Sequence, residues 1–215
     1  MLGIHDLPLF LLSGVLLNLT PGVDTRFVLS HATRGWRAGA MAALGIGAGC
    51  LVHIVGATIG LSALLLASSR AFAIVKGVGA LYLVWIGLSM LFARPLPASS
   101  GAVPAAPAAL LSDGRIFLRG ALTNALNPKV AMFFLAFLPQ FVDPTAEHRA
   151  FGFLVLGAVF DFTGTLWNLT LARLAAGAIA RRPVARHALG WVTRGVGALF
   201  VALGVKLAVA SRSAV

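Results

Sequence analysis

Three ionisable side chains stand inside stretches of the chain that are otherwise apolar. They are the carboxylates Asp24 and Asp161 and the amine Lys129. A charge at membrane depth is costly unless it is paired or hydrated, so such residues typically mark a substrate or ion pathway. We predict that these three residues carry the charge or couple protons. A structural ion pair between Asp24 and Lys129 is the alternative role. Thr165 and Asn168 follow Asp161 at i+4 and i+7, which predicts one polar stripe on a helix.

Two prolines interrupt apolar runs beside small and polar residues. A proline removes a backbone N–H and obstructs the preceding helical turn, and the carbonyl groups that it frees must find partners in lipid. Corresponding helix breaks near the bilayer midplane are typical of a transporter's binding site. A packing kink is the alternative function of each proline. The predicted substrate-binding residues flank the two breaks: Asn18, Thr20, Pro21, Gly22, Asn124, Asn127 and Pro128.

The remaining reactive side chains give little support to catalysis. His53 lies in an apolar run and is suited to relaying protons, although a hydrogen-bonded packing role is more common for such a histidine. Cys50 is the only cysteine, which excludes an internal disulfide, and we predict that it packs. No metal-ligand cluster and no nucleophile–base pair stands out, so the sequence predicts neither an enzyme nor a cofactor.

The composition places the chain in a membrane. Hydrophobic residues make up 59% of the 215 positions and charged residues 11%, and the mean hydropathy is +0.94. Apolar runs long enough to cross the hydrocarbon core recur along the chain. We predict an all-α polytopic membrane protein with about six transmembrane helices. The expected spans cover about residues 7–31, 40–67, 72–92, 116–142, 150–174 and 189–210.

The chain has two related halves. Lys76-Gly-Val-Gly-Ala-Leu-Tyr82 resembles Arg194-Gly-Val-Gly-Ala-Leu-Phe200, and the breaks at Pro21 and Pro128 correspond. Because each half holds an odd number of spans, the second enters the membrane from the opposite face, as in many secondary transporters. We therefore predict two inverted three-helix repeats, at residues 1–93 and 116–215, joined by a cytoplasmic linker at 94–115.

The net charge of +11 reflects topology rather than nucleic-acid binding. Nucleic-acid binders gather basic residues on one face, whereas here they fall mostly between the apolar runs. Eight arginines occupy the connections of one side, against three on the other. The positive-inside rule then predicts an inner (plasma) membrane protein with both termini outside. The two sets are Arg34, Arg37, Arg94, Arg115, Arg119, Arg181, Arg182 and Arg186, against Arg70, Arg149 and Arg212.

Small residues four positions apart appear twice in the second span. Gly45 with Gly49, and Gly56 with Gly60, predict close approach of another helix. Such faces serve contacts between two copies of a chain as readily as internal packing, so a homo-oligomer stays an open alternative.

Two motifs connect the chain to a known family. Asn18-Leu-Thr-Pro-Gly-Val-Asp24 and Asn127-Pro-Lys-Val-Ala-Met-Phe-Phe-Leu-Ala-Phe-Leu-Pro-Gln-Phe141 resemble segments of the lysine exporter (LysE) family, RhtB type. The basic turn Arg34-Gly-Trp-Arg-Ala-Gly39 also fits, and the resemblance extends over nearly the whole chain. Val23 stands where the family commonly has a second proline, so a milder break is expected. The resemblance implies efflux of amino acids or derivatives, such as homoserine, threonine, lysine or leucine, driven by the proton gradient.

We therefore predict a secondary transporter that exports amino acids by proton antiport. A half-helix N-terminus would bind the substrate carboxylate. Asp24 would receive the substrate ammonium or the coupling proton, with Asp161 as the second candidate. Lys129 would pair with Asp24 or repel cations. The alternatives are a passive channel, which would ignore the proton gradient, and an integral-membrane enzyme or assembly factor.

Overall fold

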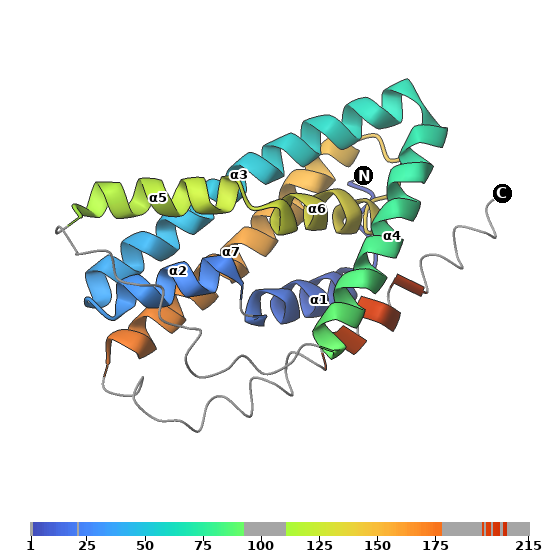
Figure 1. The fold of residues 1–215 in the computed structure, drawn as a ribbon. Helices are drawn as coiled ribbons and strands as arrows, with labels where there is room; N and C mark the ends of the chain where they lie inside the picture. The colour runs from blue at the N-terminus through green and yellow to red at the C-terminus, as the bar shows by residue number, and fades with distance from the viewer. Residues whose placement is uncertain are drawn as a thin grey trace.

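The computed structural model describes residues 2–20, 22–92, 111–177 and, near the C-terminus, 195, 197–198, 200–202 and 204–205. These residues are almost entirely helical (Figure 1), which confirms the predicted all-α class. The elements are α1 (Leu7–Leu19), α2 (Val23–Ala32), α3 (Trp36–Ala67), α4 (Ser69–Leu91), α5 (Asp113–Ala125), α6 (Pro128–Phe137), the 3-10 turn η1 (Leu138–Gln140) and α7 (Arg149–Ala176).

The helices are long and apolar enough to cross a membrane several times. α3, α4 and α7 each qualify alone, while α1 with α2, and α5 with α6, qualify as pairs bent by 54° and 51°. The described residues thus supply up to five spans of a multi-pass membrane protein. Most of the linker and of the expected sixth span at 189–210 lies outside the described residues. The inverted relation between the two halves stays a prediction.

Both helix breaks follow from local chemistry. A residue that precedes proline is driven out of the helical region by the proline ring. Thr20, which precedes Pro21, has φ −77° and ψ 118°, and Asn127, which precedes Pro128, has φ −80° and ψ 106°. Pro21 itself lies outside the described residues, and Pro128 is the first residue of α6. At both breaks the helix therefore ends and a new helix begins at the place that the sequence indicates.

Glycines let α3 and α5 pack backbone against backbone. A Cβ atom at Gly45 would overlap the main-chain oxygen of Phe117, and one at Gly49 that of Ala121. Gly56 and Gly60 have no such neighbour among the described residues, so the expected close approach is wrong for this second pair. The reason is that α5 ends at Ala125 and the chain turns away into α6 before α3 reaches Gly56.

Phenylalanines fill the interior beside the two breaks. Phe10 of α1, Phe133 and Phe137 of α6, and Phe160 of α7 are buried and stack on one another, with the rings of Phe133 and Phe160 centred 4.7 Å apart. Large apolar side chains such as Ile59 of α3 cover the outside instead. This arrangement suits lipid as the solvent, since only the interior needs shape complementarity.

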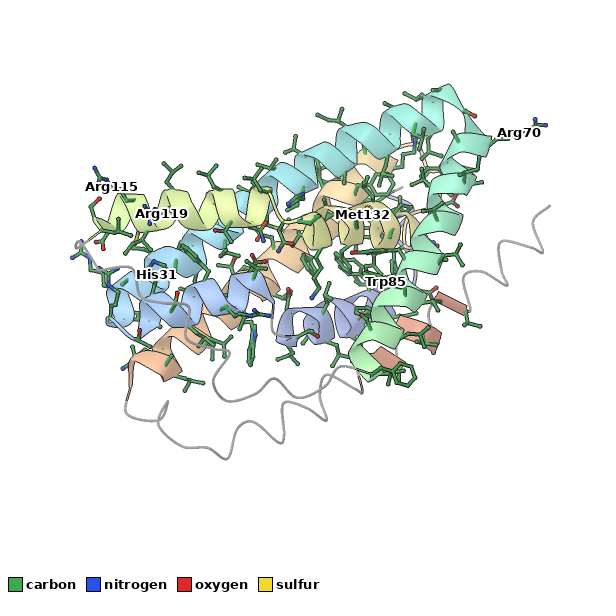
Figure 2. The ribbon with its side chains drawn as sticks, viewed as in Figure 1. His31, Arg70, Trp85, Arg115, Arg119 and Met132 are labelled. Atoms are coloured by element: carbon green, nitrogen blue, oxygen red, sulfur yellow. The ribbon has the colours of Figure 1, made fainter. Side chains whose placement is uncertain are left out.

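The basic side chains separate by molecular end. Figure 2 shows Arg115 and Arg119 near the start of α5, at the end opposite Arg70. Arg37 joins the first of these ends by pairing with Asp113. The separation agrees with the two sets of connections drawn from the sequence. Which set faces the cytoplasm stays a prediction.

Candidate functional site

A cavity of about 80 Å³ lies where the two broken helices meet α3 and α7. It has room for several water molecules or for part of a small ligand. Most of the predicted site residues line it together, although they come from opposite ends of the chain. Pro128 does not line it, and Pro21 lies outside the described residues. The predicted residues in the wall are Asn18, Thr20, Gly22, Asp24, Asn124, Asn127, Lys129, Asp161, Thr165 and Asn168.

Asp24 is held by the second helix break. Asn124 Nδ2 donates to Asp24 Oδ2 at 2.9 Å, and Asn127 Nδ2 lies 3.4 Å from both carboxylate oxygens. An amide NH₂ group can only donate. Both groups can therefore bind the carboxylate oxygens of Asp24, and neither can accept a proton from a neutral Asp24. Asp24 also lies in the first turn of α2, where the helix dipole favours negative charge.

The two half-helix N-termini differ in their capping. Asn127 Oδ1 accepts a hydrogen bond from the Lys129 N–H at 3.0 Å, and Pro128 has no N–H to offer, so the start of α6 is satisfied. α2 begins after Gly22 with no side-chain cap. The expected carboxylate-binding N-terminus is therefore available on α2 rather than on α6.

Replacing Asn127 separates its capping role from its contact with Asp24. Asn127→Ala removes the cap, and we expect the free energy of unfolding to fall by about 1 kcal/mol, while Asn127→Ser retains a capping oxygen and most of that stability. Thermal unfolding of the purified protein in detergent measures the difference. Equal melting temperatures for the two variants would contradict the capping role.

Lys129 has no carboxylate partner in the part of the chain that the structure describes. The ion pairs found there are His5–Asp6, Arg37–Asp113 and Glu147–His148, outside the cavity. The alternative of a direct Asp24–Lys129 ion pair is therefore not realised, although both side chains face the same cavity. Lys129 Nζ instead extends toward Gly22, and would lie 3.9 Å from a Cβ atom placed there. One cavity thus presents an anion and a cation that do not neutralise each other by contact.

Asp161 faces the cavity from α7. Thr165 Oγ1 lies 3.4 Å from its Oδ1, and Cys50 of α3 lines the same cavity. Gly47 makes this approach of α3 feasible, because a Cβ there would meet Thr165 Oγ1. A hydroxyl group can both donate and accept. The Thr165 hydroxyl can therefore bind Asp161 either as a carboxylate or as a neutral acid.

Asparagine side chains supply the other polar parts of the wall. Asn18 Nδ2 lies 3.3 Å from Thr163 Oγ1 and 3.4 Å from the Phe160 carbonyl oxygen, which ties α1 to α7. Asn124 is 3% exposed, and its Oδ1 has no hydrogen-bond partner among the described residues. A buried acceptor without a partner is costly.

The apolar part of the wall was not predicted. Leu17, Ile46, Val130, Phe133 and Phe160 line the cavity, and Cys50 joins them instead of serving only as a packing residue. These residue types occur in every helix of the chain, and only the rotation of each helix in the bundle selects them.

Within the described residues, no group of three or more His, Cys, Asp or Glu side chains is placed to hold a metal ion.

Comparison with known proteins settles the family. The family described as LysE type translocator matches residues 15–211. This chain belongs to the LysE translocator family. The translocator is 36% identical to an uncharacterized membrane protein of Pseudomonas aeruginosa, with 99% of each chain covered. It is 34% identical to a homoserine/homoserine lactone efflux protein of Salmonella typhi, covering 93% of this chain and 94% of the relative.

A leucine efflux protein of Salmonella typhimurium shares 29% identity with the translocator over 96% of each chain. No solved structure matches the translocator. The expected resemblance to the LysE family, RhtB type, is thus confirmed, and the cavity between the helix breaks belongs to a translocator.

Proposed function

We propose that this translocator exports small neutral amino acids or their derivatives across the inner membrane by proton antiport. The observation that carries the proposal is the single cavity in which Asp24 and Lys129 both face the ligand space without forming an ion pair with each other. An α-amino acid carries an ammonium and a carboxylate on one carbon. It therefore complements both protein charges at once.

The substrate ammonium binds at Asp24. The Asp24 carboxylate keeps lone pairs beyond those used by Asn124 and Asn127. An ammonium group has three donors and satisfies these acceptors together. Charge-assisted hydrogen bonds of this kind are roughly twice as strong as neutral ones.

The substrate carboxylate binds between Lys129 and the start of α2. The Lys129 amine extends toward Gly22, directly before the uncapped N–H groups of that helix. Both features attract an anion, one through its full charge and the other through its partial charges. The bound ligand then contacts both breaks, the first through Asp24 and the start of α2, and the second through Lys129 of α6.

Asp161 carries the coupled proton. Its partner Thr165 can either donate or accept, whereas the amide NH₂ groups that contact Asp24 can only donate and so cannot accept a proton from it. Antiport requires that the proton and the ligand exclude each other from the carrier. A proton on Asp161 and a ligand would compete for this one cavity.

The apolar wall favours neutral side chains. The side-chain end of the substrate would meet Phe133, Phe160 and their aliphatic neighbours, and Asp161 is assigned to the proton, so no carboxylate remains for the second ammonium of a substrate such as lysine. Leucine and homoserine, which the names of two relatives mention, are both neutral overall. Inverted three-helix repeats would rock around the breaks to expose the cavity alternately, with both termini outside.

Transport into liposomes tests the proposal. Proteoliposomes with an acidic lumen should accumulate labelled leucine or homoserine well above empty liposomes, and labelled lysine more weakly. A protonophore should abolish the accumulation. Equilibration without accumulation, insensitive to the protonophore, would instead identify a passive channel. Chemical conversion of the label would identify an enzyme.

A further inference from the structure

Pro128 leaves one carbonyl of α5 without its helical partner. In an unbroken helix the N–H of residue 128 would donate to the main-chain oxygen of Asn124, four residues earlier. Proline has no such hydrogen. The Asn127 N–H donates to this oxygen at 2.8 Å instead, and the second lone pair of the oxygen is left for a donor from elsewhere.

His53 supplies that second donor from another helix. Its Nε2 lies 2.8 Å from the Asn124 main-chain oxygen, and the Asn127 N–H contacts the same oxygen at 2.8 Å. A carbonyl oxygen only accepts, so Nε2 carries the hydrogen. The imidazole is stacked near Phe134, with ring centroids 6.2 Å apart. It is therefore fixed between α3 and the second break.

The consequence reaches the cavity through Asn124. The same residue lines the cavity and donates its side-chain amide to Asp24 at 2.9 Å. Fixing its carbonyl fixes the backbone from which that amide projects. His53 does not itself line the cavity.

We propose that His53 is a positioning residue that substitutes for the backbone donor lost at Pro128 and so holds the Asn124 amide against Asp24. The link to substrate rests on the proposed function of the cavity. The hydrogen bond itself does not, and the two are tested separately.

The first test is a double-variant cycle on stability, which needs no transported substrate. His53→Ala should lower the melting temperature in detergent by about 3 °C. In a Pro128→Ala background, where residue 128 regains its N–H, the same change should have little effect. Equal effects in both backgrounds would overturn the proposal. His53→Gln, which retains a donor, should lose less than His53→Ala even if Pro128→Ala fails to fold. An equal loss would count against the proposal.

The second test is counterflow of labelled leucine in proteoliposomes. His53→Ala should raise the half-saturating concentration about tenfold with little change in maximal rate, and His53→Gln should restore it. His31→Ala is the control, because that ring contacts the Phe27 carbonyl of its own helix at 2.8 Å.

The pattern of failures separates the explanations. If His53→Gln keeps counterflow but loses accumulation driven by the pH gradient, His53 is a proton relay and the positioning role is wrong. If wild-type protein shows no counterflow while the stability cycle behaves as expected, the proposed substrate fails and the positioning role stands.

Discussion

Asp24→Asn is expected to lower counterflow of labelled leucine by at least about 30-fold in rate divided by half-saturating concentration. The substitution removes the charge that meets the substrate ammonium, and losing one member of a buried charge pair costs about 2–5 kcal/mol. The substitution also places three amide side chains together with no carboxylate to accept their hydrogen bonds, since Asn124 and Asn127 donate to Asp24. Proteoliposomes measured without a pH gradient report this binding defect directly.

Asp161→Asn provides the contrast to Asp24→Asn. It should keep counterflow within about threefold of wild type, because a proton carrier is not needed for exchange, but should abolish accumulation driven by a pH gradient. Glu147→Gln is the matched control, because its side chain is 80% exposed in the connection before α7. Wild-type accumulation by Asp24→Asn would exclude a role for Asp24. Loss of counterflow in Asp161→Asn would show that Asp161, like Asp24, is needed for substrate exchange, and would contradict its separate role as the proton carrier.

Gly45→Ala is expected to destabilise the protein by about 2 kcal/mol. The added methyl would overlap the Phe117 main-chain oxygen, so α3 and α5 have to separate as whole helices. The gain in helix propensity on replacing glycine, about 1 kcal/mol, offsets only part of this cost. Thermal unfolding in detergent and the yield of folded protein both measure the effect.

Gly56→Ala is the control for the same helix and the same chemical change. No described residue lies within 4 Å of a Cβ atom placed at Gly56, so only the gain in propensity is expected and stability should be unchanged or slightly higher. A melting temperature for Gly56→Ala as low as that for Gly45→Ala would show that the outward face of α3 is also packed, as in contact with a second copy of the chain.

The helix breaks were predictable because their causes are local. A proline acts on the residue before it and on the carbonyl four positions earlier, and neither effect depends on the rest of the fold. Thr20 and Asn127 are accordingly extended. The polar residues beside the breaks could be named for the same reason.

The partners of those residues were beyond reach of the sequence. Asp24 and Asn124 are 100 positions apart, and only the packing of α2 against α5 brings the carboxylate to the amide. Lys129 extends toward Gly22 and does not pair with Asp24, because its direction depends on where α6 begins after the second break. From the sequence, His53 could be either a proton relay or a hydrogen-bonded packing residue, and its partner carbonyl is identifiable only in three dimensions.

By itself the sequence determined that this is a multi-pass helical membrane protein with two proline breaks, because hydrophobicity and proline chemistry act along the chain. The tertiary structure decided which side chains share the cavity. Asp24 meets the Asn124 amide there, Asp161 and Cys50 line the same wall, and Lys129 faces the cavity without pairing with the Asp24 carboxylate. The physical reason is the rotation of each helix about its own axis. In lipid, apolar faces of a helix are nearly equivalent, and only close contacts such as Gly45 on Phe117 select the face that turns inward.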